Sequence, residues 1–223
     1  MRVRVLKGIE EAELSLHGMA GALHLRAGSA LLGLDLGGGS YEVAYGDASS
    51  LRVGASLPLG GARLTSRGGG HDPLRLAERV ALHEEATALL RPVADEVRAL
   101  AGHGALRAAG TAGTIRDLGR LGLALAGGAT PAQVRGLVVT RSQLELAYAR
   151  LCSVTTAERV ELPGLSPRRV DLLPAGGAVV LATMEAFGLE QLELCDWGLR
   201  EGALLDAVGA RHVLSADDLV PLA

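Results

Sequence analysis

The hydrophobic pattern of the segment near residues 30–58 predicts three consecutive strands. Leu31–Leu36 is almost wholly apolar, as expected of a central strand that is covered on both faces. A second strand-like run at residues 42–45 ends at a Gly-Asp turn. The third run, Leu51–Leu57, alternates between larger apolar residues and small or polar ones, which indicates one buried face.

Helical and strand patterns alternate along the rest of the chain. Apolar residues at three- and four-residue steps predict a long helix that begins at Pro73, with a kink or break expected at Pro92. Further short strands are predicted at residues 105–109 and 192–194, which gives five in all. Residues 136–140 are compatible with an additional edge strand.

The first 29 residues read as a strand followed by a helix, with a turn at Gly8. Glu10, Glu11 and Glu13 crowd the first turn of this helix. Acidic residues at that position offset the helix dipole, which is their simplest interpretation. The functional alternative is that one of them points into a cleft as a base. A single strand–helix piece cannot bury its own apolar face, so it must pack against something.

The residues between the first two strands are the strongest candidate for chemistry. Gly37, Gly38 and Gly39 allow φ > 0 and a tight turn, whose backbone N–H groups can surround an anion such as phosphate. Asp35 precedes this loop and Glu42 follows it, an arrangement that suits a divalent metal bridging to phosphate oxygens. Two simpler interpretations stay open: an ordinary hairpin turn, and two solvated turn acids.

A second glycine-containing turn follows the strand predicted at 105–109. Its sequence G-T-A-G-T-I opens a helix, so backbone N–H groups and hydroxyls are expected to converge on one point. The alternative is a plain strand–helix turn with threonine as the cap. Two such loops in one α/β chain favour phosphate binding.

Small residues mark the last helical region. The segment 174–178, P-A-G-G-A, is expected to interrupt a helix there. Small side chains allow a backbone to approach a ligand, and they equally allow two helices to pack closely. The sequence leaves both interpretations open.

Composition narrows the class of protein. The chain has 223 residues, of which 48% are hydrophobic, so a disordered chain is excluded. A net charge of −3 gives no electrostatic case for nucleic-acid binding. Two cysteines make no disulfide framework. We find no signal peptide and no apolar stretch long enough to span a membrane, and we therefore expect a cytoplasmic protein with no membrane partner.

Four ordered motifs resemble those of the exopolyphosphatase and guanosine pentaphosphate phosphohydrolase (Ppx/GppA) family. Each alone is weak, but together they span nearly the whole chain. The motifs are G-I-E-E-A at residues 8–12, D-L-G-G-G-S-Y-E-V at 35–43, G-T-A-G-T-I at 110–115, and the pair formed by residues 171–177 and D-W-G-L-R-E-G at 196–202.

The resemblance implies an α/β fold of the ribonuclease H-like class, in the actin-like and sugar-kinase superfamily, with a mixed five-stranded sheet flanked by helices. Family members have two such domains with the active site between them. The family's D-x-G-S-N-S-x-R loop has no match here, so most of the N-terminal domain is expected to be missing. Residues 1–29 would be its remnant, either loosely attached or dimerising through an uncovered apolar face. Residues 30–210 would form the second domain, and 211–223 a C-terminal tail.

The resemblance also implies a function and its residues. Family members use Mg²⁺ to release terminal phosphate from inorganic polyphosphate, or the 5′ γ-phosphate from guanosine pentaphosphate, by attack of water. Carried over by motif, Glu11 is the general base, and Asp35 and Glu42 hold the metal. The residues expected to bind phosphate are Gly37, Gly38, Gly39, Ser40, Gly110, Thr111, Gly113 and Thr114.

The departures from the family pattern leave alternatives. Tyr41 replaces a smaller residue and is expected to crowd the glycine loop. Without one wall of the cleft, the chain would be an impaired phosphate- or nucleotide-binding module, or a folded remnant with no ligand. A homodimer, or a separate polypeptide carrying the N-terminal domain, would complete the site.

Overall fold

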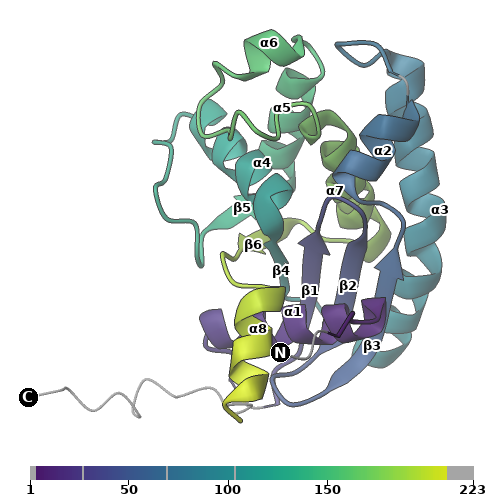
Figure 1. Ribbon diagram of the computed structural model, residues 1–223, viewed down its shortest axis with the longest axis vertical. Coiled ribbons are helices and arrows are strands. Elements are labelled where there is room, and N and C mark those ends of the chain that lie inside the picture. The colour runs from purple at the N-terminus through teal and green to yellow at the C-terminus, as the bar shows by residue number, and fades with distance from the viewer. Residues whose placement is uncertain (1–3, 27, 69, 103, 210–223) are drawn as a thin grey trace, which may run out of the picture.

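A mixed six-stranded sheet forms the centre of the structure, a computed structural model (Figure 1). The strand order is β3-β2-β1-β4-β6-β5; β1, β4 and β6 are parallel to one another, and the other neighbours pair antiparallel. The structure describes residues 4–26, 28–68, 70–102 and 104–209. The strands are β1 (Leu31–Leu36), β2 (Tyr41–Gly46), β3 (Leu51–Leu57), β4 (Ala108–Thr111), β5 (Val138–Thr140) and β6 (Gln191–Leu194).

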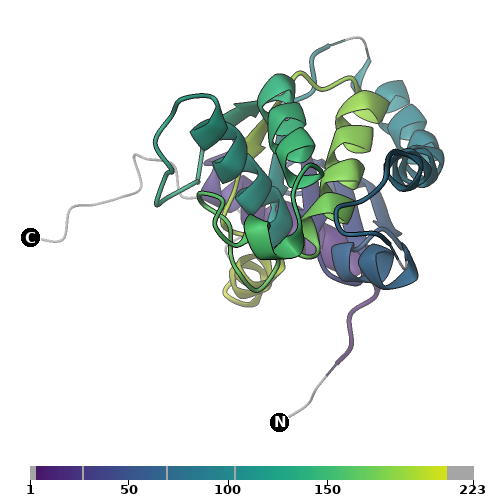
Figure 2. The same ribbon diagram turned by 90° about the horizontal axis from the view of Figure 1, so that it is seen from above.

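Helices cover both faces of this sheet, which gives three layers (Figure 2). Helices α3, α4 and α7 pack on one face, and α1 lies on the other with α8 beside it. The helices are α1 (Gly8–Ala22), α2 (Gly61–Gly68), α3 (Leu76–Ala101), α4 (Ala112–Leu125), α5 (Arg141–Leu151), α6 (Thr156–Arg159), α7 (Leu173–Phe187) and α8 (Leu199–Ala207).

The α/β class and the flanking helices are confirmed, whereas the strand count of five is too low by one. The additional strand is β5, at the segment that the pattern left open as an edge strand. Residues 4–7 form no strand before α1, and Val3 lies outside the described part of the chain. The tail predicted at 211–223 also lies outside it.

Helix breaks expected at two prolines do not occur. Helix α3 runs unbroken through Pro92, which lies on its exposed side, so of the expected kink or break the break is wrong. Ala88, whose carbonyl loses its N–H partner there, is also an exposed residue, so water can replace the missing N–H. Pro174 does not interrupt α7 because it occupies the first turn, where no intrahelical N–H bond is needed. Gly176 and Gly177 then pack against Thr114 and Tyr148, which supports close helix packing as their role.

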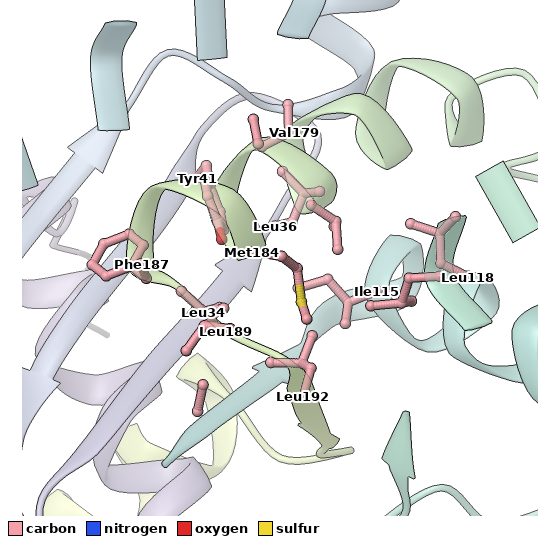
Figure 3. Packing of buried hydrophobic residues seen from close by; sticks show 14 of the residues in the cluster. Leu34, Leu36, Tyr41, Ile115, Leu118, Val179, Met184, Phe187, Leu189 and Leu192 are labelled. Atoms are coloured by element: carbon pink, nitrogen blue, oxygen red, sulfur yellow. The ribbon is translucent and has the colours of Figure 1, made fainter. Parts of the chain in front are cut away.

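The main hydrophobic core lies between the sheet and the α3, α4 and α7 layer (Figure 3). Leu34 and Leu36 of β1 face Met184 of α7 in this core. Tyr41 also points into it, and its hydroxyl lies 3.1 Å from Thr183 Oγ1. The expectation that Tyr41 crowds the glycine loop is therefore wrong, because its side chain is buried on the opposite face of the sheet from Glu42.

A second, smaller core lies on the other face and fixes α1 in place. Ala12, Leu16 and Met19 are fully buried there against the sheet. Helices α1 and α8 touch so closely that a Cβ on Gly202 would overlap the carbonyl oxygen of Leu14. The apolar side of α1 is therefore covered, and α1 is not loosely attached.

This close helix contact leads to a stability prediction. Gly202→Ala should lower the free energy of unfolding by about 3 kcal/mol, because backbone atoms of α1 cannot move away as a flexible side chain would. Urea denaturation measures the effect. Gly104→Ala is the control, since a Cβ there meets nothing within 4 Å, and it should change stability by less than about 0.5 kcal/mol. Equal effects of the two substitutions would show that α1 and α8 separate easily.

Candidate active site

Four polar residues form a row across β3, β2, β1 and β4. Ser56 pairs in register with Glu42, Glu42 with Asp35, and Asp35 with Thr111. Residues that are paired across neighbouring strands point to the same face of a sheet. This polar row therefore lies on the α1 face, at the carboxyl ends of the parallel strands β1 and β4, where ligands of open α/β sheets bind.

Helix α1 crosses the polar row and brings Glu11 to it. Gly8 packs against the β3 member of the row so closely that a Cβ would overlap it. Ser15 donates a hydrogen bond of 2.6 Å from its Oγ to Asp35 Oδ2. Glu11 lies between these contacts, one helical turn before Ser15 and on the same side of the helix. Burial is the main cause that raises the pKa of Glu42, and the negative charge of Glu11 raises it further.

Asp35 and Glu42 are not solvated turn acids. Burial is the main cause that raises the pKa of each carboxyl, and the charge of Asp35 raises that of Glu42 further. Hydrogen bonds from Ser15 to Asp35 and from Ser56 to Glu42, the latter 2.8 Å long, oppose this rise. Two largely buried acids at one point are typical of a functional site rather than of a surface turn.

The triple-glycine loop, residues 37–40, joins β1 to β2 as a hairpin, but its glycines do not adopt the backbone conformation that was predicted. None of Gly37, Gly38 and Gly39 takes a positive φ. The tight packing is at Gly60 instead, in the next segment, which passes directly over the loop. A Cβ on Gly60 would overlap the backbone of Gly38 and Gly39, whereas a Cβ on Gly39 meets nothing within 4 Å.

Helix α2 holds the carbonyl side of this loop. The N–H of Gly61 donates to Gly37 O at 3.0 Å, and the N–H of Arg63 donates to Gly38 O at 3.0 Å. The Arg63 guanidinium also donates from Nε to Gly39 O at 2.9 Å. Because a trans peptide points its N–H opposite to its C=O, the N–H groups of residues 38, 39 and 40 point away from α2. Within the described part of the chain, those of Gly38 and Gly39 have no backbone acceptor.

Ser40 completes the loop beside the polar row. Its hydroxyl hydrogen-bonds the Glu42 carboxylate, which lowers the pKa of that acid against the effect of burial. The Ser40 side chain thus lies between the outward amide groups of the loop and the buried Glu42 carboxylate. The arrangement can bind an anion on the amides and a cation on the acid at the same time.

The Gly-Thr loop, residues 110–114, forms the start of α4. Thr111 is the N-cap residue, but its side chain makes no capping hydrogen bond, so threonine capping does not explain the motif. Ala112 has a φ of +70°, a strained conformation for a residue with a Cβ. Gly110 lies in β4 with Ile115 packed against it, and Thr114 is buried. No hydrophobic pattern signals the strain at Ala112.

An arginine that the sequence analysis did not identify lies over this loop. The Arg169 guanidinium packs against Gly113 so closely that a Cβ there would overlap it. Asp117, almost fully buried on α4, accepts a 3.1 Å hydrogen bond from Arg169 Nε and a 3.3 Å bond from the N–H of Ser166. A buried acid thus fixes one positive charge at the helix N-terminus. Arg169 lies two residues before the motif segment 171–177, and this position is its only signal in the sequence.

The two loops lie at the same end of the sheet. Asp35 and Thr111 are register partners, and Gly198 at the start of α8 lies between them. A Cβ on Gly198 would be 3.3 Å from Asp35 Oδ2 and 3.4 Å from Thr111 Oγ1. A Cβ on Gly61, beside the triple-glycine loop, would be 3.9 Å from Thr114 Oγ1. The structure therefore brings the carboxylates, both loops and Glu11 to the same end of the sheet.

The carboxylates are suited to a loosely enclosed metal rather than a protein cage. Among the residues that the structure describes, no three His, Cys, Asp or Glu side chains gather closely enough to hold a metal ion. Mg²⁺ commonly binds one or two carboxylates and completes its octahedron with waters and substrate phosphates. Asp35 and Glu42 are register partners and lie beside the outward amides. This arrangement suits a Mg²⁺ ion bound in that way.

A sequence model of the Ppx/GppA phosphatase family matches residues 1–211. The chain belongs to this family. Among solved structures, the Ppx/GppA family member from Aquifex aeolicus has a TM-score of 0.78 and 27% identity, over 95% of this chain and 66% of that one. The ribonuclease H-like, actin-like fold implied by the motifs is thereby confirmed.

Curated relatives of the family show how much of the longer protein this chain spans. An uncharacterised protein of Streptomyces coelicolor is 39% identical over 93% of this chain and 59% of its own length. Exopolyphosphatase 1 of Mycobacterium leprae is 33% identical over 92% and 59%. A guanosine-5′-triphosphate,3′-diphosphate pyrophosphatase of Aeromonas hydrophila is 27% identical over 97% and 41%. The chain thus spans at most about three fifths of these relatives.

No helix within the described ranges is both long enough and apolar enough to cross a membrane.

Proposed function

We propose that this chain carries the carboxylate and amide wall of a phosphohydrolase that releases terminal phosphate from inorganic polyphosphate or guanosine pentaphosphate. One observation carries the proposal. Helix α1 holds Glu11 over the polar row, beside two buried acids and the outward amides of the triple-glycine loop. The names of the relatives, an exopolyphosphatase and a guanosine phosphate pyrophosphatase, support the same reaction class.

Each group has a role in this proposal. The N–H groups of Gly38 and Gly39 bind the oxygens of the terminal phosphate, where negative charge builds up in the transition state. Glu11 accepts the proton of the attacking water. Asp35 and Glu42 would hold Mg²⁺, which when bound neutralises charge on the phosphoryl oxygens. Arg169, fixed by Asp117, adds a positive charge at the Gly-Thr loop.

The partial span of the relatives motivates a second candidate. The chain covers 59% of the Mycobacterium leprae exopolyphosphatase, so the opposite wall of the cleft would come from another segment or polypeptide, such as a separate N-terminal domain or a second copy. Without that wall the chain would bind phosphate chains and not hydrolyse them.

Phosphate release separates the two candidates. Purified protein is incubated with tripolyphosphate or guanosine pentaphosphate, with Mg²⁺ and with EDTA, and orthophosphate is measured. Mg²⁺-dependent release supports the hydrolase. Tripolyphosphate binding without release supports the binding module, and absence of both binding and release contradicts the proposal in either form.

Arg63 provides a binding prediction. Arg63→Ala removes the guanidinium bond to Gly39 O and should weaken tripolyphosphate binding about tenfold, because the loop loses one of the groups that orient its amides. Isothermal titration calorimetry measures it. Arg91→Ala is the control, an exposed arginine on α3, and should leave affinity within about twofold. If both variants bind like the wild type, α2 does not preorganise the loop.

A further inference from the structure

A serine lies on the buried side of α1, where the side chains around it are apolar. Ser15 is 2% exposed, and its neighbours on this side, Ala12, Leu16 and Met19, are fully buried in the smaller core. A buried hydroxyl is costly unless it is hydrogen-bonded, and serine also forms helices less readily than alanine. Packing alone therefore does not account for a serine at this position.

The hydroxyl of Ser15 is committed to Asp35. A serine within a helix often donates to the carbonyl four residues earlier, which here belongs to Glu11. Among the described residues, Ser15 instead makes one side-chain hydrogen bond, from its Oγ to Asp35 Oδ2 at 2.6 Å. A hydroxyl that donates to an ionised carboxylate typically makes a bond of this length. The bond therefore joins α1 to one acid of the polar row.

This bond restrains the plane of the Asp35 carboxylate. The terminal torsion of an aspartate is broad and roughly two-fold, so a carboxylate without such a bond turns readily. With Oδ2 held by Ser15, Oδ1 is the oxygen that accepts no side-chain hydrogen bond from the described part of the chain. The bond therefore gives the second carboxylate oxygen a defined direction.

The second acid of the polar row is held by a serine in the same manner. Ser56 of β3 donates from its Oγ to Glu42 Oε1 at 2.8 Å, and Glu42 is the register partner of Asp35. Gly8, the first residue of α1, packs against Ser56 so closely that a Cβ would overlap it. Helix α1 thus carries the serine that holds one acid and contacts the serine that holds the other.

We propose that Ser15 is a positioning residue for the divalent cation, because it holds Asp35 with one carboxylate oxygen available to the metal. The inference rests on the proposed function for the role of the metal in the reaction, and its test measures metal binding alone. Hydrogen bonds to a ligating carboxylate typically contribute about 10- to 100-fold to metal affinity. Because Glu11 lies one helical turn before Ser15, the same bond fixes the candidate base relative to the metal.

The test measures Mn²⁺ binding to the full chain in the absence of phosphate, from the electron paramagnetic resonance signal of free Mn²⁺. Ser15→Ala should raise the Mn²⁺ dissociation constant about 10- to 100-fold. Ser15→Thr keeps the hydroxyl and should bind Mn²⁺ like the wild type. Ser50→Ala is the matched control, since it removes a serine hydroxyl 3.2 Å from Asp47 Oδ1, beyond the end of β2 that is distant from Glu42. It should leave Mn²⁺ affinity unchanged.

A purely structural role for Ser15 would give a different result. If the bond served only to hold α1 on the sheet, Ser15→Ala would lower the urea midpoint of unfolding and leave the Mn²⁺ affinity of the folded chain unchanged. Tripolyphosphate affinity in EDTA reports on the triple-glycine loop, with which Ser15 shares no hydrogen bond among the described residues. It should be the same in the wild type and in Ser15→Ala, which shows that the variant is folded.

The outcomes are distinct from those of the phosphohydrolase test. Weaker Mn²⁺ binding by Ser15→Ala, together with wild-type binding by Ser15→Thr, supports the positioning role. The same result without any phosphate release still supports it and contradicts only the hydrolase. The proposal is overturned if Ser15→Ala binds Mn²⁺ like the wild type, if Ser15→Thr loses as much affinity as Ser15→Ala, or if the wild type binds no Mn²⁺.

Discussion

Glu11→Gln is expected to lower the rate of phosphate release about 10²- to 10⁴-fold, the usual contribution of a general base. The amide keeps the shape of the carboxylate but cannot accept the proton from water. Because Glu11 contacts no part of either phosphate loop through a hydrogen bond among the described residues, tripolyphosphate affinity should stay within about twofold. A stopped assay for orthophosphate and a separate calorimetric titration measure the two quantities.

Glu13→Gln is the matched control for this variant. Glu13 is on the same helix, but two residues further along it points to a different side. It should release phosphate at the wild-type rate. If Glu11→Gln retained full activity, or if Glu13→Gln lost as much, the assignment of the base would be wrong.

Asp35→Asn should stabilise the folded chain at neutral pH while abolishing Mg²⁺-dependent activity. Burial raises the pKa of Asp35 above its ordinary value of 3.8, so the charged form is less favourable in the folded than in the unfolded state. Its contribution to stability is therefore full below pH 3.8 and is lost as pH rises through the folded pKa. An uncharged asparagine avoids this loss and should add on the order of 1 kcal/mol at pH 7.

Urea denaturation at several pH values tests this expectation. The difference between Asp35→Asn and the wild type should be largest at pH 7 and shrink towards pH 4. Added Mg²⁺ should stabilise the wild type and not the variant, because a ligand stabilises only the state that binds it. Asp95→Asn, a mostly exposed acid on α3, should show neither effect. A destabilised Asp35→Asn at pH 7 would show that the buried charge is compensated.

The carboxylates of the site could be predicted from local sequence because the strand register places them side by side. Asp35 and Glu42 flank a short hairpin loop, so they must face each other across two strands. Glu11 and Ser15 are four residues apart, so one helix face presents both. The same alternation places the Tyr41 side chain on the opposite face of the sheet from Glu42, away from the glycine loop.

The remaining features of the site depend on contacts between distant segments. Nothing near Gly37 indicates that Gly60 and Arg63 pass over the loop, so closely that a Cβ at position 60 would overlap the backbone of Gly38 and Gly39. The pair of Asp117 and Arg169, 52 residues apart, joins helix α4 to the turn that precedes α7. Periodicity along the chain carries no information about such pairings, which the packing of the layers decides.

The most direct test is where a metal and a phosphate bind. Crystals soaked with Mn²⁺ and tripolyphosphate would locate the metal by anomalous scattering. We predict a manganese peak about 2.0–2.5 Å from an oxygen of Asp35 or Glu42. We also predict a phosphate on the amides of Gly38 and Gly39. Metal bound elsewhere, or phosphate bound away from both loops, would contradict the convergence of these groups on one phosphoryl site.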